Sequence, residues 1–297
     1  VYGNDWESLN SSDRIVYDNE SERLNSSEKL YVFVDVDRGR RLGNQMFMFA
    51  TAYALARTHN RTCIVGPTTA QFIFPHFPLA EKFCQIGELP MNAWHLCVPK
   101  YGFKESDLSL PFKNVSINGF IYSWKYFSTS FSQVRQIFMS NKADQERALD
   151  FLMNIPANKN STFVGIHVRR GDRSSIRQYN SGARLPGVEF LHMAMSYYKV
   201  KYSDVHFVVC SDNIRWCKAE LSHLTFDISY STDASVQVDL AILSQCNHTI
   251  MTHGTYSWWA AFLAGGEAVY FDHQFEDELR LNGSLKNHFM PEWKGLH

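Results

Sequence analysis

The sequence predicts an α/β protein whose parallel sheets carry helices on both faces. From residue 162 onward, short apolar runs of strand length alternate with segments of helical period over about 110 residues. A β-branched and aromatic run at residues 30–36 also leads through a glycine-containing loop into a helical pattern. Such alternation is typical of parallel strands joined by helical crossovers.

The first helix is expected over residues 45–58, because its apolar residues recur on one face and Asn44 stands where an N-cap belongs. Residues 66–130 are rich in proline and aromatic side chains, and their pattern assigns no elements. The remaining strands are expected over residues 162–168, 206–210, 225–229, 248–252 and 268–272. The remaining helices are expected over residues 130–154, 187–202, 214–221, 236–245 and 257–263.

The length of 297 residues predicts two domains after a polar leader. Ser, Asn, Asp and Glu supply 17 of residues 1–29, so we expect a flexible stem there. The domains are expected over residues 30–157 and 158–297, each with its own parallel sheet.

Composition excludes several classes of protein. The 29 Lys and Arg balance 30 Asp and Glu, whereas a protein that binds duplex nucleic acid needs a basic excess. The 45% content of hydrophobic residues is too high for a disordered chain. No apolar run reaches the roughly 18 residues of a membrane span. Because the chain starts at Val1, we expect that a targeting or anchoring segment preceded it.

Glycosylation signatures favour a lumenal or secreted protein. Eight N-x-S/T triplets occur, against about 2.4 expected from composition. The six cysteines form no CxxC pair or zinc spacing, which leaves disulfides or buried thiols open. We expect one of the eight triplets, at Asn247, to be buried in its apolar stretch. The other candidate acceptors are Asn10, Asn19, Asn25, Asn60, Asn114, Asn160 and Asn282.

Polar residues follow three strands of the second predicted sheet, at residues 167–172, 211–213 and 253–257. Ligands of open parallel sheets bind at these carboxyl ends. The guanidinium groups of Arg169 and Arg170 match phosphate oxygens, and a Gly- and Thr-containing loop before a helix offers free amides. Two neighbouring anion sites indicate a diphosphate ligand.

Structural explanations compete with these motifs. An ion pair with Asp172 would explain the arginines without any ligand. Asp35 and Asp37 have the D-x-D form that often holds a metal, but we favour an ordinary strand end with a solvent-facing acid. Trp258 and Trp259 lie in an Ala-rich helix, where we expect them in the core and not in a sugar platform.

Four blocks of the chain resemble the alpha-1,2-fucosyltransferase family. They are residues 40–56 (RRLGNQMFMFATAYALA), 164–172 (VGIHVRRGD), 243–266 (LSQCNHTIMTHGTYSWWAAFLAGG) and 289–293 (FMPEW), in the family's order. The resemblance implies a GT-B-type fold of two Rossmann-like domains facing a cleft. It implies an inverting transfer of L-fucose from GDP-fucose to the 2-hydroxyl of a terminal galactose, without a metal or other cofactor. It also implies a Golgi-lumen enzyme held by an N-terminal anchor.

Under this resemblance, residues 30–157 form the acceptor-side domain with the GNQ loop, and residues 158–297 bind GDP-fucose. Arg169 and Arg170 would stabilise the departing diphosphate, with Arg169 essential. Asn44 would approach the reacting fucose. The donor-binding set would also include His167, Asp239, His253, Gly254, Thr255, Tyr256 and Ser257, the first two at the guanine and ribose.

The catalytic base stays open at this point. Asp172 would be the base or would orient Arg169, and a dissociative route needs no dedicated base. Arg177 stands where some distant relatives have a glutamate, and Arg40 stands where members of the family usually have glycine. The alternatives in function are a sugar-binding paralogue without turnover and a lumenal transferase that uses a metal at Asp35 and Asp37.

Overall fold

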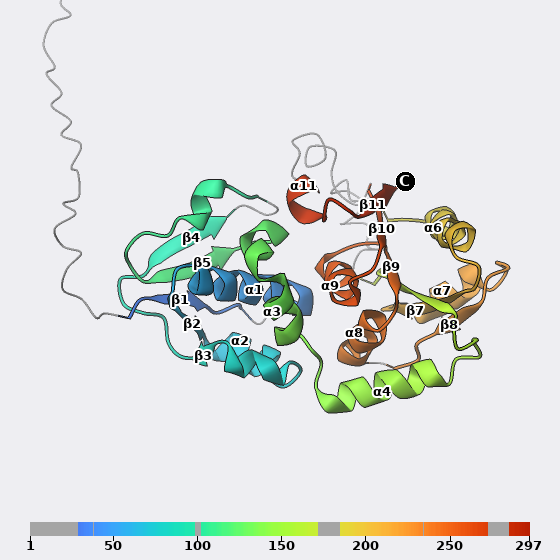
Figure 1. Cartoon of the computed structure of the whole chain (residues 1–297), viewed down its shortest axis with the longest axis horizontal. Coiled ribbons are helices and arrows are strands. Elements are labelled where there is room, and N and C mark those ends of the chain that lie inside the picture. Colours follow the sequence, from blue (N-terminus) through green and yellow to red (C-terminus); the bar gives the residue numbers. More distant parts are fainter. Residues whose placement is uncertain (1–28, 38, 99–101, 172–184, 234, 273–284) are drawn as a thin grey trace, which may run out of the picture.

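The computed structural model describes residues 29–37, 39–98, 102–171, 185–233, 235–272 and 285–297. Within them the chain forms two parallel sheets in separate halves of the molecule, with helices packed on their faces (Figure 1). The strand order is β3-β2-β1-β5-β4 in the first sheet and β11-β10-β9-β6-β7-β8 in the second. This arrangement confirms the predicted α/β fold. Residues 1–28 of the predicted stem lie outside the described residues.

Three strands of the first sheet fall within residues 66–130, whose elements the sequence pattern did not assign, whereas its first strand lies within the residues 30–36 where a strand was expected. Its strands are β1 (Tyr31–Val34), β2 (Thr62–Val65), β3 (Gln85–Ile86), β4 (Trp94–Val98) and β5 (Val115–Gly119). Its helices and 3-10 turns are α1 (Leu42–Thr58), α2 (Pro67–Ile73), η2 (Pro78–Lys82), η3 (Glu105–Leu108), η4 (Trp124–Ser130) and α3 (Phe131–Ile137).

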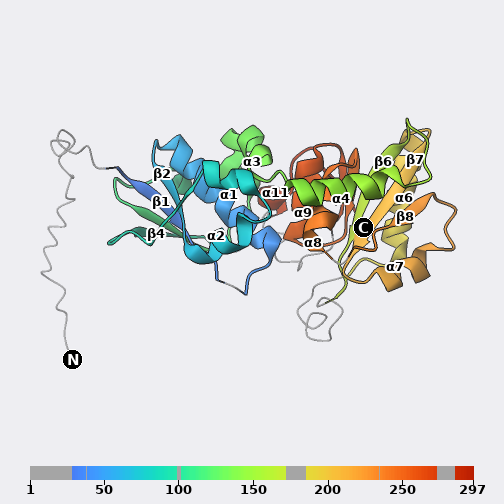
Figure 2. The same ribbon diagram turned by 90° about the horizontal axis from the view of Figure 1, so that it is seen from below.

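The second sheet follows the predicted alternation closely. The helix α4 (Lys142–Met153) leads into it, packed along α8 (Figures 1 and 2). Its strands are β6 (Thr162–Val168), β7 (Val205–Ser211), β8 (Ile228–Tyr230), β9 (His248–Met251), β10 (Ala268–Phe271) and β11 (Lys294–Leu296). Its helices are α6 (Val188–Lys201), α7 (Ile214–Leu221), α8 (Val236–Ser244), α9 (Thr255–Ala264) and α11 (Leu285–His288).

Two expectations about helices were wrong. The N-cap of α1 is Arg41, so Asn44 is the third residue of the helix and not its cap. The single helix expected over residues 130–154 is two helices, α3 and α4. The break between them has a local cause, because the Asn141 side chain accepts a hydrogen bond from the Asp144 amide (2.9 Å) and so starts α4 anew.

One aromatic core joins the two halves. Helix α1 buries 14 of its 17 residues, so it is buried on every side and not only toward its own sheet. The Phe47 ring centroid lies 4.6 Å from that of Trp258 and 5.0 Å from that of Trp259, and Phe127 stacks on Trp259 at 5.7 Å. Both tryptophans are fully buried, which confirms their predicted place in the core.

One disulfide is present among the described residues. Cys63 of β2 is bonded to Cys84, just before β3, and therefore fastens the edge of the first sheet. Cys97 is exposed, and Cys210, Cys217 and Cys246 are buried free thiols. The described cysteines therefore include both a disulfide and free thiols. Within the described part of the chain, no helix has the length and apolar character needed to cross a bilayer.

The described glycosylation triplets share one position in the fold. Asn60, Asn114, Asn160 and Asn247 each precede a parallel strand by one or two residues, so they lie at the amino edges of the two sheets. Asn247 is exposed, so its predicted burial was wrong. Its Oδ1 accepts a hydrogen bond from the Phe163 amide (2.8 Å), as the Oδ1 of Asn114 does from the Tyr31 amide (3.0 Å). Outside the described residues lie Asn10, Asn19, Asn25 and Asn282.

Candidate functional site

The candidate site begins at the carboxyl end of β6, where His167 is buried. Its Nδ1 lies 2.5 Å from the Ser257 hydroxyl, and its ring centroid lies 4.6 Å from that of Tyr256. Burial lowers the pKa of His167 to about 3, and the nearby Asp212 carboxylate opposes this shift only in part. Because the Ser257 hydroxyl donates to the His253 carbonyl (2.9 Å), the neutral imidazole must donate through Nδ1. Its Nε2 is then an acceptor.

Arg169 is fixed by the neighbouring strand and by the start of α9. The Thr252 hydroxyl donates to the His167 carbonyl (3.1 Å) and accepts from the Arg169 amide (3.0 Å), which ties the ends of β6 and β9 together. Gly254 has a φ of +91°, and a Cβ built there would lie 2.5 Å from the Arg169 Nη1. The structure therefore brings the Arg169 guanidinium to the amino end of α9, as the strand-end pattern predicts.

Arg170 points to a different part of the site. Its amide donates to the Asp212 Oδ1 (2.8 Å), and its guanidinium carbon lies 3.8 Å from the centroid of the Trp216 ring on α7. Its Nη1 donates to the Pro186 carbonyl (3.4 Å). The two neighbouring arginines thus have separate sets of partners, and diphosphate binding by both stays a prediction.

The GNQ residues, 43–45, form part of the first turn of α1 and not a loop, and this turn meets the start of α9. The Thr255 hydroxyl donates to the Asn44 Oδ1 (2.6 Å), and Trp259 Nε1 donates to the Gly43 carbonyl (2.9 Å). A Cβ at Gly43 would lie 2.6 Å from the Tyr256 amide nitrogen, so the approach of the two helices requires glycine. The amino ends of α1 and α9 therefore converge, and both carry partial positive charge.

One of the predicted donor-binding residues, Asp239, lies on α8. Its Oδ1 accepts a hydrogen bond from the Ser231 hydroxyl (2.6 Å). Burial raises the pKa of Asp239 to about 6, although that hydrogen bond acts in the opposite direction. Tyr256 lies beside it, with its hydroxyl donating to the Val236 carbonyl (2.6 Å) and its pKa raised by burial. Tyr256 thus lies next to both Asp239 and His167.

The remaining predicted residues have different outcomes. Asp172 lies outside the described residues, and His253 is buried at the end of β9. Asp35 Oδ1 accepts from the Thr69 amide (2.8 Å), and Asp37 Oδ2 accepts from Arg40 Nε (3.0 Å). Both acids of the D-x-D pattern therefore have partners within the protein. Among the described residues, no group of three or more His, Cys, Asp or Glu side chains is placed to hold a metal.

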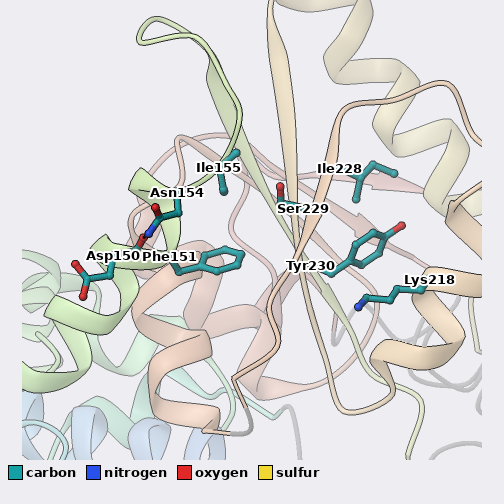
Figure 3. A pocket seen from close by; sticks show the side chains of 8 residues that line it. All are labelled: Asp150, Phe151, Asn154, Ile155, Lys218, Ile228, Ser229 and Tyr230. Atoms are coloured by element: carbon teal, nitrogen blue, oxygen red, sulfur yellow. The ribbon is translucent and has the colours of Figure 1, made fainter.

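A cavity of about 450 Å³ lies elsewhere, between α4, α7 and the edge strand β8 (Figure 3). Figure 3 shows Phe151 and Asn154 on the α4 side of this cavity, across from Ile228, Tyr230 and Lys218. It contains none of the predicted site residues. Thr252 and Ser231, which hold Arg169 and Asp239 in place, were missed by the sequence reasoning because a single hydroxyl after a strand carries no specific signal.

With this geometry established, comparisons with known proteins identify the family. The model of glycosyl transferase family 11 matches residues 11–297. The chain belongs to this family. It is 30% identical to galactoside alpha-(1,2)-fucosyltransferase 2 of Sus scrofa, over 86% of this chain and 77% of that protein. It is 32% identical to galactoside alpha-(1,2)-fucosyltransferase 1 of Rattus norvegicus, over 87% of this chain and 71% of that protein.

Solved structures support the fold of this family 11 glycosyltransferase. NodZ alpha-1,6-fucosyltransferase, soaked with GDP-fucose, matches with a TM-score of 0.53 at 14% identity, over 82% of this chain and 96% of that one. POFUT1 in complex with GDP matches with a TM-score of 0.53 at 11% identity, over 83% and 100% of the two chains. Similarity at these identities concerns the fold alone, and it confirms the GT-B-type architecture.

Proposed function

We propose that this family 11 enzyme transfers L-fucose from GDP-fucose to the 2-hydroxyl of a terminal galactose, with inversion and without a metal. The observation that carries the proposal is the meeting of Arg169, the amino end of α9 and Asn44 at the carboxyl ends of the strands. Relatives named galactoside alpha-(1,2)-fucosyltransferases at about 30% identity support the choice of substrates.

The chemistry follows from the charge that develops during transfer. As the fucosyl bond breaks, negative charge grows on the β-phosphate, and the Arg169 guanidinium with the positive amino end of α9 stabilises it. The neutral His167 and the Asp239 carboxylate bind the nucleoside, where the carboxylate accepts hydrogen bonds from guanine. Asn44 orients the sugar. The acceptor hydroxyl attacks from the side opposite the diphosphate, which inverts the anomeric carbon.

The remaining roles follow the family resemblance. Arg170 assists the diphosphate or fixes the loop through Asp212 and Trp216. Asp172 acts as the base or orients Arg169. Residues 30–157 bind the acceptor and residues 158–297 bind the donor. The enzyme works in the Golgi lumen.

The central test substitutes the arginine at the start of α9. Arg169→Ala is expected to lower GDP release from GDP-fucose and a β-galactoside by about 100- to 1000-fold, because it removes a preorganised charge from the leaving group. Arg215→Ala, an exposed arginine on α7, is the matched control and retains activity. Circular dichroism and thermal melting check that both variants are folded.

Two other outcomes would favour the alternatives. GDP binding by the wild type without any turnover on galactosides would favour a sugar-binding paralogue. Loss of activity in excess EDTA, restored by a divalent cation, would favour a metal-dependent transferase. Full activity of Arg169→Ala would overturn the proposed role of this residue.

A further inference from the structure

An exposed aromatic side chain stands at the acceptor side of the site. Strand β5 ends at Gly119, whose φ of +92° turns the chain so that Phe120 follows the strand at its carboxyl end. Arg40 precedes α1, which follows the neighbouring strand β1, so it lies at the same edge of the first sheet. Only three residues later, Gly43 packs against the start of α9. Phe120 therefore belongs to the edge that faces the donor side.

Arg40 holds one face of the Phe120 ring. Its guanidinium carbon lies 4.1 Å from the ring centroid, its Nε donates to the Asp37 Oδ2 (3.0 Å), and its Nη1 donates to the Gly119 carbonyl. The Tyr122 ring supports the edge of Phe120, with 5.9 Å between centroids. Phe120 nevertheless remains 44% exposed, whereas the Arg40 side chain is only 17% exposed. The guanidinium thus covers one face of the ring, and the exposed area lies elsewhere on it.

The chemistry of this platform matches one class of ligand. The axial 4-hydroxyl of a β-galactoside leaves the hydrogens on C3, C4 and C5 together on one face of the sugar, and this apolar patch packs on aromatic rings. A galactose bound by that face keeps its 2-hydroxyl at the rim, where it is free to approach the donor. In a glucoside, whose 4-hydroxyl is equatorial, H4 lies on the opposite face from H3 and H5, so the three hydrogens do not form this patch.

We propose that Phe120 is the platform that binds the terminal galactose of the acceptor, and that Arg40 is a positioning residue that fixes the plane of its ring. This inference rests on the proposed function, because it names the residue that recognises the acceptor of that reaction. The planar guanidinium, held by Asp37 and the Gly119 carbonyl, keeps the ring in a single orientation. The ring is therefore ready for the sugar before binding.

Saturation-transfer NMR of methyl β-galactoside with the GDP-bound protein tests the platform directly. In the wild type, H3, H4 and H5 of the sugar are expected to receive the strongest saturation. Phe120→Ala loses this pattern, and Phe120→Trp keeps it because the indole offers a similar face. Phe112→Ala is the matched control, since Phe112 is 72% exposed but precedes β5 at the opposite, amino edge of the sheet.

Steady-state kinetics provides the second readout. Phe120→Ala is expected to raise the KM for the galactoside about tenfold while the KM for GDP-fucose stays within about twofold. It also reduces the preference for galactosides over glucosides. Arg40→Lys keeps the charge but not the planar stacking, so it raises the KM for the galactoside with an unchanged kcat. A purely structural role of Arg40 would instead lower the melting temperature and leave that KM unchanged.

The outcomes for the two proposals are distinguishable. An unchanged saturation pattern and galactoside KM in Phe120→Ala would overturn the platform, while GDP release by the wild type would leave the proposed function standing. Absence of GDP release by the wild type would overturn the proposed function. In that case the loss of saturation in Phe120→Ala alone would still identify the platform as a galactoside-binding surface.

Discussion

Asp239 is the residue whose ionisation should control donor binding. It is the carboxylate that accepts hydrogen bonds from guanine in the proposed complex, and burial raises its pKa to about 6 in the free enzyme. Below that pH the protonated group no longer accepts both bonds. The diphosphate of GDP-fucose is esterified at both ends and does not titrate near pH 6, so the dissociation constant of GDP-fucose is expected to be constant above pH 7 and to rise by up to about tenfold per pH unit below 6. Isothermal titration calorimetry from pH 5 to pH 8 measures it.

The same shift has a consequence for stability, with the opposite dependence on pH. The pKa in the folded state lies above the value of about 3.9 for an unfolded chain, so the contribution of Asp239 to stability is present at low pH and is lost as pH rises toward 6. Asp239→Asn should abolish the pH dependence of GDP-fucose binding between pH 5 and 6. Asp227→Asn, an exposed acid before β8, should leave it intact. If the dependence persists in Asp239→Asn, another group controls donor affinity.

Arg170 shows which features of the site could be predicted from the sequence, namely its position at a strand end, and which could not, namely its partners. The HVRRGD and HGTYS patterns correctly predicted that Arg169 and the start of α9 lie together, because strand ends in a parallel sheet converge. The stacking of Arg170 on Trp216 depends on where α7 packs, and this is decided by tertiary contacts far along the chain. Asn44 is a further example, because its bond to Thr255 forms only once the two halves meet.

At the scale of single elements, α9 allows a matched pair of substitutions at its two ends. Gly254 and Gly265 both have positive φ, +91° and +75°. A Cβ at Gly254 would meet the Arg169 guanidinium at 2.5 Å, whereas its nearest neighbour at Gly265 would be 3.8 Å away. Gly254→Ala should therefore displace Arg169 and lower kcat/KM by about tenfold or more. Gly265→Ala should keep its activity and lose about 1–2 kcal/mol of stability.

Activity assays and urea unfolding of the two variants separate these effects. Both changes strain the backbone, and Gly254→Ala should cost more stability, because its φ of +91° and ψ of 167° lie in a region that is essentially confined to glycine. Equal activities after correction for the folded fraction would mean that contact between Gly254 and Arg169 does not matter for transfer.

The elements that the sequence predicted well are the long periodic ones. The strand over residues 162–168 and the helix over residues 214–221 have the observed bounds, because alternation and caps such as Asn213 are local signals. The first sheet was harder to predict. It contains the two-residue strand β3 and several 3-10 turns, which are too short to show a period. The position of each strand in the first sheet depends on its parallel pairing with neighbouring strands.

At the scale of the whole molecule, the shared aromatic core predicts that the two halves unfold together. Phe47 of α1 packs on Trp258 and Trp259 of α9, so neither half can open without exposing the other. Phe47→Ala is expected to cost about 3–5 kcal/mol, as is usual for a fully buried aromatic side chain. Phe112→Ala, at an exposed residue before the amino end of β5, should change stability by less than about 0.5 kcal/mol.

Tryptophan fluorescence and far-ultraviolet circular dichroism should then report one coincident transition in urea for the wild type. Two separate transitions would show that the halves fold independently despite their common core. A split of the transition in Phe47→Ala alone would assign the coupling to this contact.

Because the glycosylation triplets precede the strands, glycans attached to the enzyme would lie apart from the glycan acceptor that it is proposed to modify. Glycans join asparagine through Nδ2, so Asn114 and Asn247 could carry them while their Oδ1 atoms still hold the Tyr31 and Phe163 amides. Arg169 follows the carboxyl end of β6, whereas these asparagines precede strands at the amino edges. Glycans attached at the described triplets would therefore lie at the amino edges of the sheets, away from the carboxyl edge that carries Arg169.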